Sequence, residues 1–174
     1  MTEPDTPTLH NVTVYYLEML ARPQIQLEPP CDGLSVIHAK SPSVAYYRFL
    51  YDAVGEDYRW LSRRKLSDEE LAKIIQDPLD EIQVLHLDGT PIGFAELSRH
   101  DLGNVELVQF GLIPNWHGRG IGPWFLKWVI DHVWNPSVQR FWLHTCTFDH
   151  PAALPMYQKA GFVLYDEKQI QREY

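Results

Sequence analysis

Apolar residues recur along this chain with two different periods, and the changes of period outline its elements. Residues 11–20 and 34–40 are rich in β-branched and aromatic side chains, which predicts two strands. The segment after the second strand predicts a helix, with Ser41 as its N-cap, Pro42 at its first position and Gly55 at its end. The first third of the chain therefore predicts two strands and a helix.

A second, shorter helix is predicted after a polar connection. Ser67 is followed three residues later by Glu70, the spacing of a capping box, and the helix should end before Pro78. The connection between the two helices carries Tyr58 and Trp60 among four basic residues. We expect it to be either a solvated loop with two half-buried aromatic rings or a wall of an acceptor site.

The middle of the chain predicts three strands. Residues 81–87 and 92–98 flank a turn at 88–91, and Pro91 predicts that this turn is longer than a two-residue hairpin. The next strand, residues 104–113, is apolar on both faces, which is typical of a central strand covered on both sides.

Two features of this central strand stand out. Glu106 and Gln109 interrupt an otherwise apolar segment, and a carboxylate there is costly to bury. Gly111 predicts a β-bulge or a close approach of another segment to the backbone.

The last third predicts helix, strand, helix and strand. After Gly120 an apolar stripe has helical spacing and should face the core: Gly122, Phe125, Leu126, Val129, Ile130 and Val133. A strand at 140–146, a helix closed by Gly161 and a strand at 162–168 follow. The whole order predicts an α/β fold.

Length and charge restrict the possibilities further. The chain has 174 residues, enough for one buried core, so we expect a single domain over 1–174, with 1–10 as a flexible tail and 11–33 as an N-terminal strand and loop. The formal net charge of −8 argues against nucleic-acid binding and favours a cationic partner.

The cysteines and the N-terminus predict a cytoplasmic protein. Cys31 and Cys146 lie far apart in the sequence, and the acidic start of the chain lacks the features of a signal peptide. No segment approaches eighteen consecutive apolar residues, so we expect no membrane-spanning helix.

Three glycines in five positions, Gly118, Gly120 and Gly122, lie just before a predicted helix. Backbone N–H groups at a helix start have no intrahelical acceptor, and glycine lets an anion such as a phosphate approach them. The alternative is a tight turn in which the glycines only permit positive φ. A Walker loop and a dinucleotide fingerprint are both excluded by the residues and spacing.

Residues 117–122, His-Gly-Arg-Gly-Ile-Gly after "LIP", resemble the acetyl-CoA signature of the GNAT superfamily of N-acetyltransferases. A second signature of that superfamily resembles "HPAALPMYQKAGF", residues 150–162. The resemblance implies a mixed, mostly antiparallel twisted sheet of six to seven strands with helices on both faces. Two positions depart from the pattern: His117 replaces the usual Gln or Arg, and His150 replaces a common Asn, whose contact Asp149 could share.

The resemblance also implies a cosubstrate, acetyl-CoA, and a set of site residues. Its pyrophosphate would bind the backbone N–H groups of a short segment: His117, Gly118, Arg119, Gly120, Ile121 and Gly122. The N–H of Leu112 would face the thioester oxygen, and His150 would contact the cofactor. Tyr157 would be the general acid beside the thiolate, and Glu106 the general base, acting directly or through a water.

Other polar residues have a plainer interpretation beside a functional one. Packing or a solvated surface is the simpler role for the following: Tyr47, Glu96, His100, Asp101 and His144. Asp149 and His150 are adjacent and lack the spacing of metal ligands, so no metal is expected.

The predicted activity is therefore direct acetyl transfer to a primary amine in a ternary complex. The acceptor would be a small molecule or a lysine-like group, without nucleic acid or membrane, and the sequence leaves a homodimer open. Two alternatives stay open: a non-catalytic acyl-CoA-binding or sensing module, and a partner-binding domain that uses the aromatic-rich first half.

Overall fold

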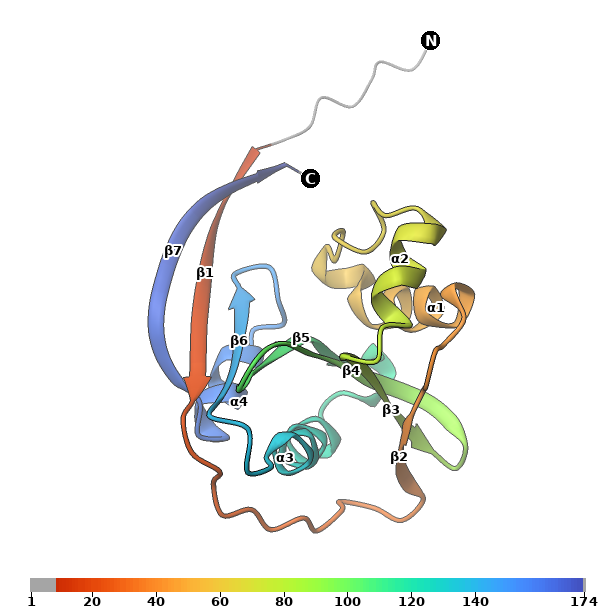
Figure 1. Cartoon of the computed structure of the whole chain (residues 1–174), viewed down its shortest axis with the longest axis vertical. Helices are drawn as coiled ribbons and strands as arrows, with labels where there is room; N and C mark the ends of the chain where they lie inside the picture. Colours follow the sequence, from red (N-terminus) through yellow and green to blue (C-terminus); the bar gives the residue numbers. More distant parts are fainter. Residues whose placement is uncertain (1–8, 174) are drawn as a thin grey trace.

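The computed structural model describes residues 9–173, and a twisted seven-stranded sheet runs through them (Figure 1). The strand order is β2-β3-β4-β5-β6-β1-β7, and neighbouring strands are antiparallel except β5 and β6, which are parallel. The strands are β1 (Leu9–Met19), β2 (Leu34–His38), β3 (Asp80–Leu87), β4 (Thr90–Asp101), β5 (Asn104–Leu112), β6 (Arg140–Cys146) and β7 (Val163–Glu173). The predicted mostly antiparallel α/β sheet is confirmed.

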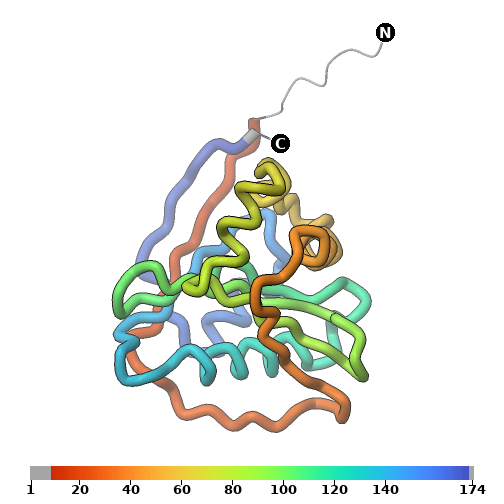
Figure 2. Tube along the Cα trace, turned by 45° about the vertical axis from the view of Figure 1, so that its right-hand side comes forward, coloured from red at the N-terminus to blue at the C-terminus, as the bar shows by residue number. Residues whose placement is uncertain are grey.

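Helices cover both faces of the sheet, as predicted (Figures 1 and 2). They are α1 (Val44–Gly55), α2 (Asp68–Ile75), α3 (Ile121–Val133) and α4 (Ala153–Lys159), with short 3-10 helices η1 (Glu56–Tyr58) and η2 (Pro114–Trp116). The α1 and α2 helices pack on one face, and α3 and α4 on the other. Within residues 9–173, no helix has both the length and the apolar character needed to cross a membrane.

Each face has its own apolar core. On one face the predicted stripe of α3 is fully buried at Phe125 and Val129, although it begins at Ile121 rather than at Gly122. On the other face Tyr47 and Phe94 are among the buried residues that join α1 to the sheet. Burying such a side chain stabilises the fold by about 1.5–3 kcal/mol, which fixes the helices on the sheet.

The helix starts agree with the sequence in one case and differ in the other. Ser67 and Glu70 form the predicted capping box, with hydrogen bonds of 3.2 and 2.8 Å. The N-cap of α1 is Ser43, whose hydroxyl accepts from the N–H of Tyr46, and not Ser41. Ser41 has a φ of 47°, a left-handed conformation that places it outside the helix.

The turn between β3 and β4 is shorter than predicted. Leu87 pairs with Thr90, so Asp88 and Gly89 alone form the turn, with φ values of 49° and 81°. Positive φ at both positions is the requirement of a type I′ hairpin turn, which Asp-Gly satisfies. Pro91 is accommodated within β4 by a register shift opposite His86.

The β1 strand begins at Leu9, inside the predicted tail of residues 1–10. Residues 1–8 of the expected tail lie outside the described residues, but Leu9 and His10 belong to β1 and pair with Glu173 and Arg172 of β7. These long paired strands extend past the rest of the sheet, opposite the connection between α1 and α2 (Figure 1).

The β5 strand contains the irregularity that prepares the site. Leu97 pairs with Leu107 and Glu96 with Gln109, so the bulged residue is Val108 and not Gly111. Gly111 instead allows close approach, because a Cβ there would come within 2.5 Å of Val54 Cγ1.

Beyond this bulge, β5 and β6 separate. Their parallel pairing runs from Asn104 with Arg140 to Leu107 with Leu143 and then stops. The second half of β5 therefore has β4 on one side and no strand on the other.

Candidate active site

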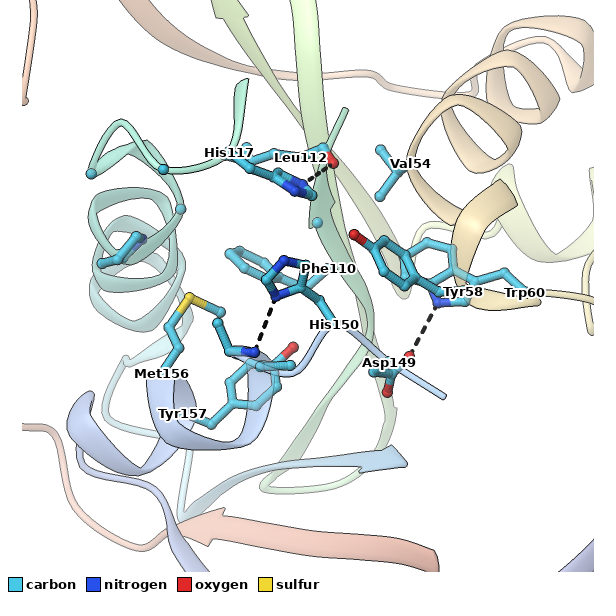
Figure 3. Close-up of a pocket in the computed structure, with 17 residues that line it drawn as sticks. Val54, Tyr58, Trp60, Phe110, Leu112, His117, Asp149, His150, Met156 and Tyr157 are labelled. Atoms are coloured by element: carbon cyan, nitrogen blue, oxygen red, sulfur yellow. Dashed lines mark hydrogen bonds between the residues drawn. The ribbon is translucent and has the colours of Figure 1, made fainter. Parts of the chain in front are cut away.

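A cavity of about 410 Å³ lies where β5 and β6 separate (Figure 3). It is bounded by the end of β5, the loop before α3, the loop before α4 and the α1–α2 connection. Its lining is Val54, Tyr58, Trp60, Phe110, Gly111, Leu112, His117, Gly118, Gly120, Gly122, Pro123, Asp149, His150, Ala152, Ala153, Met156 and Tyr157. The two motifs singled out in the sequence therefore meet in one cavity.

The glycine segment, residues 118–122, forms one rim of this cavity. Gly118 and Gly120 have φ values of 73° and 74°, so a side chain at either position would be strained. Gly120 is the N-cap of α3 and supplies no side-chain acceptor, and the N–H groups of Ile121 and Gly122 have no intrahelical partner. A Cβ on Gly118 would meet no protein atom within 4 Å, and Gly118, Gly120 and Gly122 all line the cavity, which suits the approach of an anion to the helix start.

His117 contributes differently from the prediction. Its backbone N–H donates to the carbonyl of Pro114 at 3.1 Å, so that N–H belongs to η2 and not to the anion-binding segment. Its Nε2 lies 3.0 Å from the carbonyl oxygen of Leu112, to which it donates. The ring packs edge-on against His150, with centroids 5.2 Å apart. His117 therefore braces the loop against β5.

Asp149 and His150 organise the opposite rim. The Asp149 carboxylate accepts from the Thr145 hydroxyl at 2.6 Å, the Cys146 N–H at 2.9 Å and the Trp60 indole N–H at 3.4 Å. His150 Nδ1 accepts from the N–H of Ala152 at 3.0 Å, which fixes its ring in the cavity (Figure 3). Asp149 thus ties β6 to the α1–α2 connection.

Backbone groups of β5 face the gap between the strands. Ile113 donates to Ile92 of β4 at 2.8 Å, and hydrogen-bonded pairs alternate along an antiparallel ladder. The N–H and C=O groups of Leu112 and Phe110 therefore point away from β4, into the region where β6 has left. The sequence named Leu112 for this position and missed Phe110.

Tyr157 points from α4 into the cavity (Figure 3). Its side chain is buried, and its hydroxyl forms no hydrogen bond within the described part of the chain. Burial, followed by the nearby negative charge of Asp149, raises the pKa of this phenol above its usual value. Tyr157 therefore holds its proton at neutral pH.

Glu106 and His144 lie on the other side of the separated strands. Glu106 Oε1 is 3.9 Å from His144 Nε2. His144 lines a second cavity, and the Glu106 carboxylate lines neither that cavity nor the first. Burial and then the charge of Glu96 raise the pKa of Glu106. Burial and then the charge of Arg172 lower the pKa of His144, which keeps its imidazole neutral at pH 7.

Glu96 belongs to a buried polar cluster behind Glu106. It is 0% exposed, and the Tyr47 hydroxyl and the Arg63 guanidinium donate to its two carboxylate oxygens. Tyr47 is therefore a core residue and does not wall the acceptor site. The cluster places a fixed negative charge near Glu106 in a region of low dielectric.

The side chains of several other predicted residues do not line the cavity. Arg119 is exposed and stacks on Trp116, with its guanidinium carbon 4.8 Å from the ring centroid, and the Ile121 side chain is buried. His100 pairs with Asp80 at 2.9 Å on the surface. Among residues 9–173, no three His, Cys, Asp or Glu side chains are grouped to hold a metal ion, and the absence of a metal stays a prediction.

Comparison with known proteins relates this geometry to a family. The sequence profile of the Acetyltransferase (GNAT) family matches residues 47–162, which include both motifs and both sides of the cavity. An uncharacterized N-acetyltransferase from Mycobacterium tuberculosis is 31% identical over 97 residues, which cover 56% of this chain and 62% of that protein. The chain therefore spans less than two thirds of the length of this relative.

Solved structures share the fold at low identity. A GCN5-related N-acetyltransferase from Sphaerobacter thermophilus aligns with a TM-score of 0.69 and 19% identity, over 93% of this chain and 51% of that chain. A GNAT family acetyltransferase from Elizabethkingia anophelis, with acetyl-CoA bound, aligns with a TM-score of 0.57 and 19% identity, over 78% of this chain and 80% of that chain.

Proposed function

Because the chain belongs to the GNAT acetyltransferase family, which uses acetyl-CoA, we propose that it transfers an acetyl group to a primary amine by direct attack in a ternary complex. One observation carries this proposal. The separation of β5 and β6 brings a glycine-lined helix start, unpaired strand amides and a protonated tyrosine into one cavity. These are the groups that acetyl transfer from a thioester requires.

Acetyl-CoA fits the first cavity. The open space before Gly118 and the uncapped N-terminus of α3 suit its pyrophosphate, because the helix start offers N–H donors and a positive dipole end. The apolar walls formed by Met156 and Phe110 suit the chain that leads from the pyrophosphate to the sulfur. When bound there, acetyl-CoA supplies the thioester carbonyl that the amine attacks.

The N–H groups of Leu112 and Phe110 are our candidate donors to the carbonyl oxygen of the thioester. Both point into the gap, and neither is needed by a neighbouring strand. Fixed donors aimed at an oxygen that gains negative charge lower the barrier without reorganisation. His117 holds the Leu112 carbonyl, and it thereby fixes the peptide that follows Leu112 at the end of β5.

Protons move on both sides of the gap. We assign Tyr157 as the acid that protonates the departing thiolate as the C–S bond breaks and the C–N bond forms. On the acceptor side His144 lies between the second cavity and Glu106, so it is placed to receive the proton that the amine loses, with Glu106 stabilising the imidazolium. Glu106 then acts through His144 rather than by direct contact.

The experiment that tests this proposal separates binding from transfer. Calorimetry should detect acetyl-CoA binding, and an amine library should release free thiol together with an acetylated amine seen by mass spectrometry. Binding without release on any amine would favour the sensing module, and no binding would reject both functions. The Cys146→Ser variant should keep its turnover within about twofold, because direct transfer uses no thiol nucleophile.

A further inference from the structure

A second cavity, of about 660 Å³, lies beside the first. Its floor is formed by β5 and β6, one wall by the paired ends of β1 and β7, and the other by the α1–α2 connection (Figures 1 and 2). It is lined by Leu9, Tyr51, Tyr58, Arg59, Trp60, Leu61, Ser62, Lys65, Val108, Gln109, His144, Cys146, Asp149, Gln171 and Arg172. Residues distant in sequence thus build one concave site.

The two cavities have a common wall. Tyr58, Trp60 and Asp149 line both of them. The hydrogen bond from Trp60 to Asp149 closes this wall across the gap between the separated strands. These three side chains therefore separate a molecule in the second cavity from the cavity that we propose for acetyl-CoA.

The charge of the second cavity is opposite to that of the whole chain. Its lining includes three cationic side chains, Arg59, Lys65 and Arg172, against one carboxylate, Asp149, although the formal net charge of the chain is −8. Asp149 already accepts three hydrogen bonds from the protein. Lys65 and Arg172 alone therefore give this cavity two cations against the single carboxylate of Asp149.

Lys65 and Arg172 are the cations of this cavity that form no ion pair with a described side chain. Among the side chains that the structure describes, those of residues 9–172, neither has a carboxylate partner, whereas several other arginines are paired with carboxylates: Arg22, Arg48, Arg63, Arg64, Arg99 and Arg140. Arg59 adds charge to the same rim while it contacts His10 and the Phe148 ring.

Both cations are held on fixed supports. Lys65 lies in a segment that Arg48 anchors, since the Arg48 guanidinium donates to the carbonyls of Arg63 and Leu66 at 3.4 and 2.9 Å. Arg172 lies on β7, where it pairs in register with His10 of β1. The two charges thus face the cavity from opposite walls.

We propose that this cavity selects an amine acceptor that also carries an anionic group, a carboxylate or a phosphate, which Lys65 and Arg172 bind. The proposal rests on the acetyltransferase function argued above and specifies its acceptor. The amine of such a molecule lies toward His144 and the common wall, and its anionic group lies toward the rim. The total charge of the chain alone predicted a cationic acceptor, and the local charge of the cavity argues for the opposite.

Matched acceptor pairs test this selection on the full chain. Each pair keeps the amine and removes the anion: an amino acid against its amide, and an amino-sugar phosphate against the amino sugar. We expect kcat/KM to be at least about tenfold higher for the anionic member of one pair, since two charge contacts of modest strength combine to about that factor. The pair that shows the preference distinguishes carboxylate from phosphate.

Variants locate the preference. Combining Lys65→Gln with Arg172→Gln should raise KM for the anionic amine about tenfold, with acetyl-CoA affinity kept within about twofold. Lys168→Gln removes a cation from the same strand as Arg172 but outside both cavities, and it should leave KM unchanged. Arg172→Glu should reverse the preference toward a cationic amine.

The outcomes separate the acceptor class from the activity itself. Equal turnover of the charged and neutral members of both pairs, or a preference that survives the double variant, overturns the anionic acceptor while the acetyltransferase function stands. Acetyl-CoA binding without thiol release on any amine, charged or neutral, overturns the proposed function as well.

Discussion

The two cavities differ in how the chain builds them. The acetyl-CoA cavity is formed mainly by two continuous stretches, residues 110–123 and 149–157, with backbone groups and apolar side chains. The acceptor cavity takes residues from the first strand, the α1–α2 connection, the middle strands and the last strand, and charged side chains line its rim. In our proposal, local backbone geometry therefore binds the cosubstrate, whereas the acceptor is bound by side chains that only the complete sheet brings together.

Tyr157→Phe should have the largest effect, and it should act on the chemistry of the acetyl-CoA side alone. Losing the proton donor should lower kcat about 100-fold, because general acid catalysis contributes about that factor, while the acetyl-CoA Kd changes less than about twofold. Steady-state kinetics and calorimetry measure the two quantities. Tyr58→Phe, a change at the wall common to both cavities, is the matched control and should lower kcat far less.

Glu106→Gln should have the second-largest effect on activity, and it should affect the reaction of the amine. We expect kcat/KM for the amine to fall about tenfold or more, because the carboxylate that stabilises the protonated His144 is gone. An unchanged acetyl-CoA Kd together with this loss would show that Glu106 serves the acceptor side and not the binding of acetyl-CoA. Full activity with an unaltered pH profile would remove Glu106 from the mechanism.

Gly118→Ala should reveal the anion-binding segment. The added Cβ would stand in open space at a residue that lines the first cavity, so we expect acetyl-CoA to bind about tenfold more weakly while the KM of the amine is unchanged. Gly89→Ala is the matched control, because Gly89 also has a positive φ and open space at its Cβ position. Both variants should lose about 1 kcal/mol of stability from backbone strain.

Two results would contradict that comparison. If Gly118→Ala and Gly89→Ala both bind acetyl-CoA as tightly as the unaltered protein does, the glycines only shape a tight turn. A matching loss in both variants would show that the effect comes from destabilisation, which thermal unfolding would detect.

Glu96→Gln should produce the smallest change, a shift of the pH profile. The active enzyme needs Glu106 ionised, and the negative charge of Glu96 raises the pKa of Glu106, so activity is lost as pH falls through that raised value. Removing the charge lowers this pKa, although burial still raises it, and should move the acidic limb of kcat/KM to lower pH. The limb should not move in Glu81→Gln, a carboxylate change at a partly buried ion pair with Arg99.

Glu96→Gln also leaves Arg63 without its carboxylate partner. We expect a loss of stability of about 3 kcal/mol, because an uncompensated charge stays partly buried. The pH profile is therefore measured at a temperature where circular dichroism shows the variant to be folded. An acidic limb that stays in place under those conditions would show that the Glu96 charge does not contribute to the raised pKa of Glu106.

The sequence predicted the elements well because their patterns are local. The apolar stripe of α3, the capping box at Ser67 and the strand at 140–146 each depend on neighbouring residues, and each is confirmed. The N-cap of α1 was misplaced because both Ser41 and Ser43 carry the hydroxyl that a cap needs. The β3–β4 turn was misjudged because the register shift that accommodates Pro91 depends on the partner strand.

The part of the site that depends on local motifs was also predictable, and the part that depends on strand pairing was not. Its glycine segment and Tyr157 followed from motifs, and Leu112 and Tyr157 line the same cavity. The N–H of His117 was wrongly included, because η2 uses it. The bonding direction of Phe110 depends on the β4 register, and the charges of Lys65 and Arg172 converge only through the β1–β7 pairing, which no short pattern reveals.

The early end of the β5–β6 ladder also sets how long the amide protons of this protein are retained. Val105 and Leu107 lie in the part of β5 that is paired with β6, whereas Leu112 and Phe110 carry N–H groups without a strand partner. In deuterated water these two should exchange much faster than Val105 or Leu107 on the same strand, since only bonded amides are protected. Slower exchange at these two positions on adding acetyl-CoA would identify the cosubstrate as the element that completes the sheet.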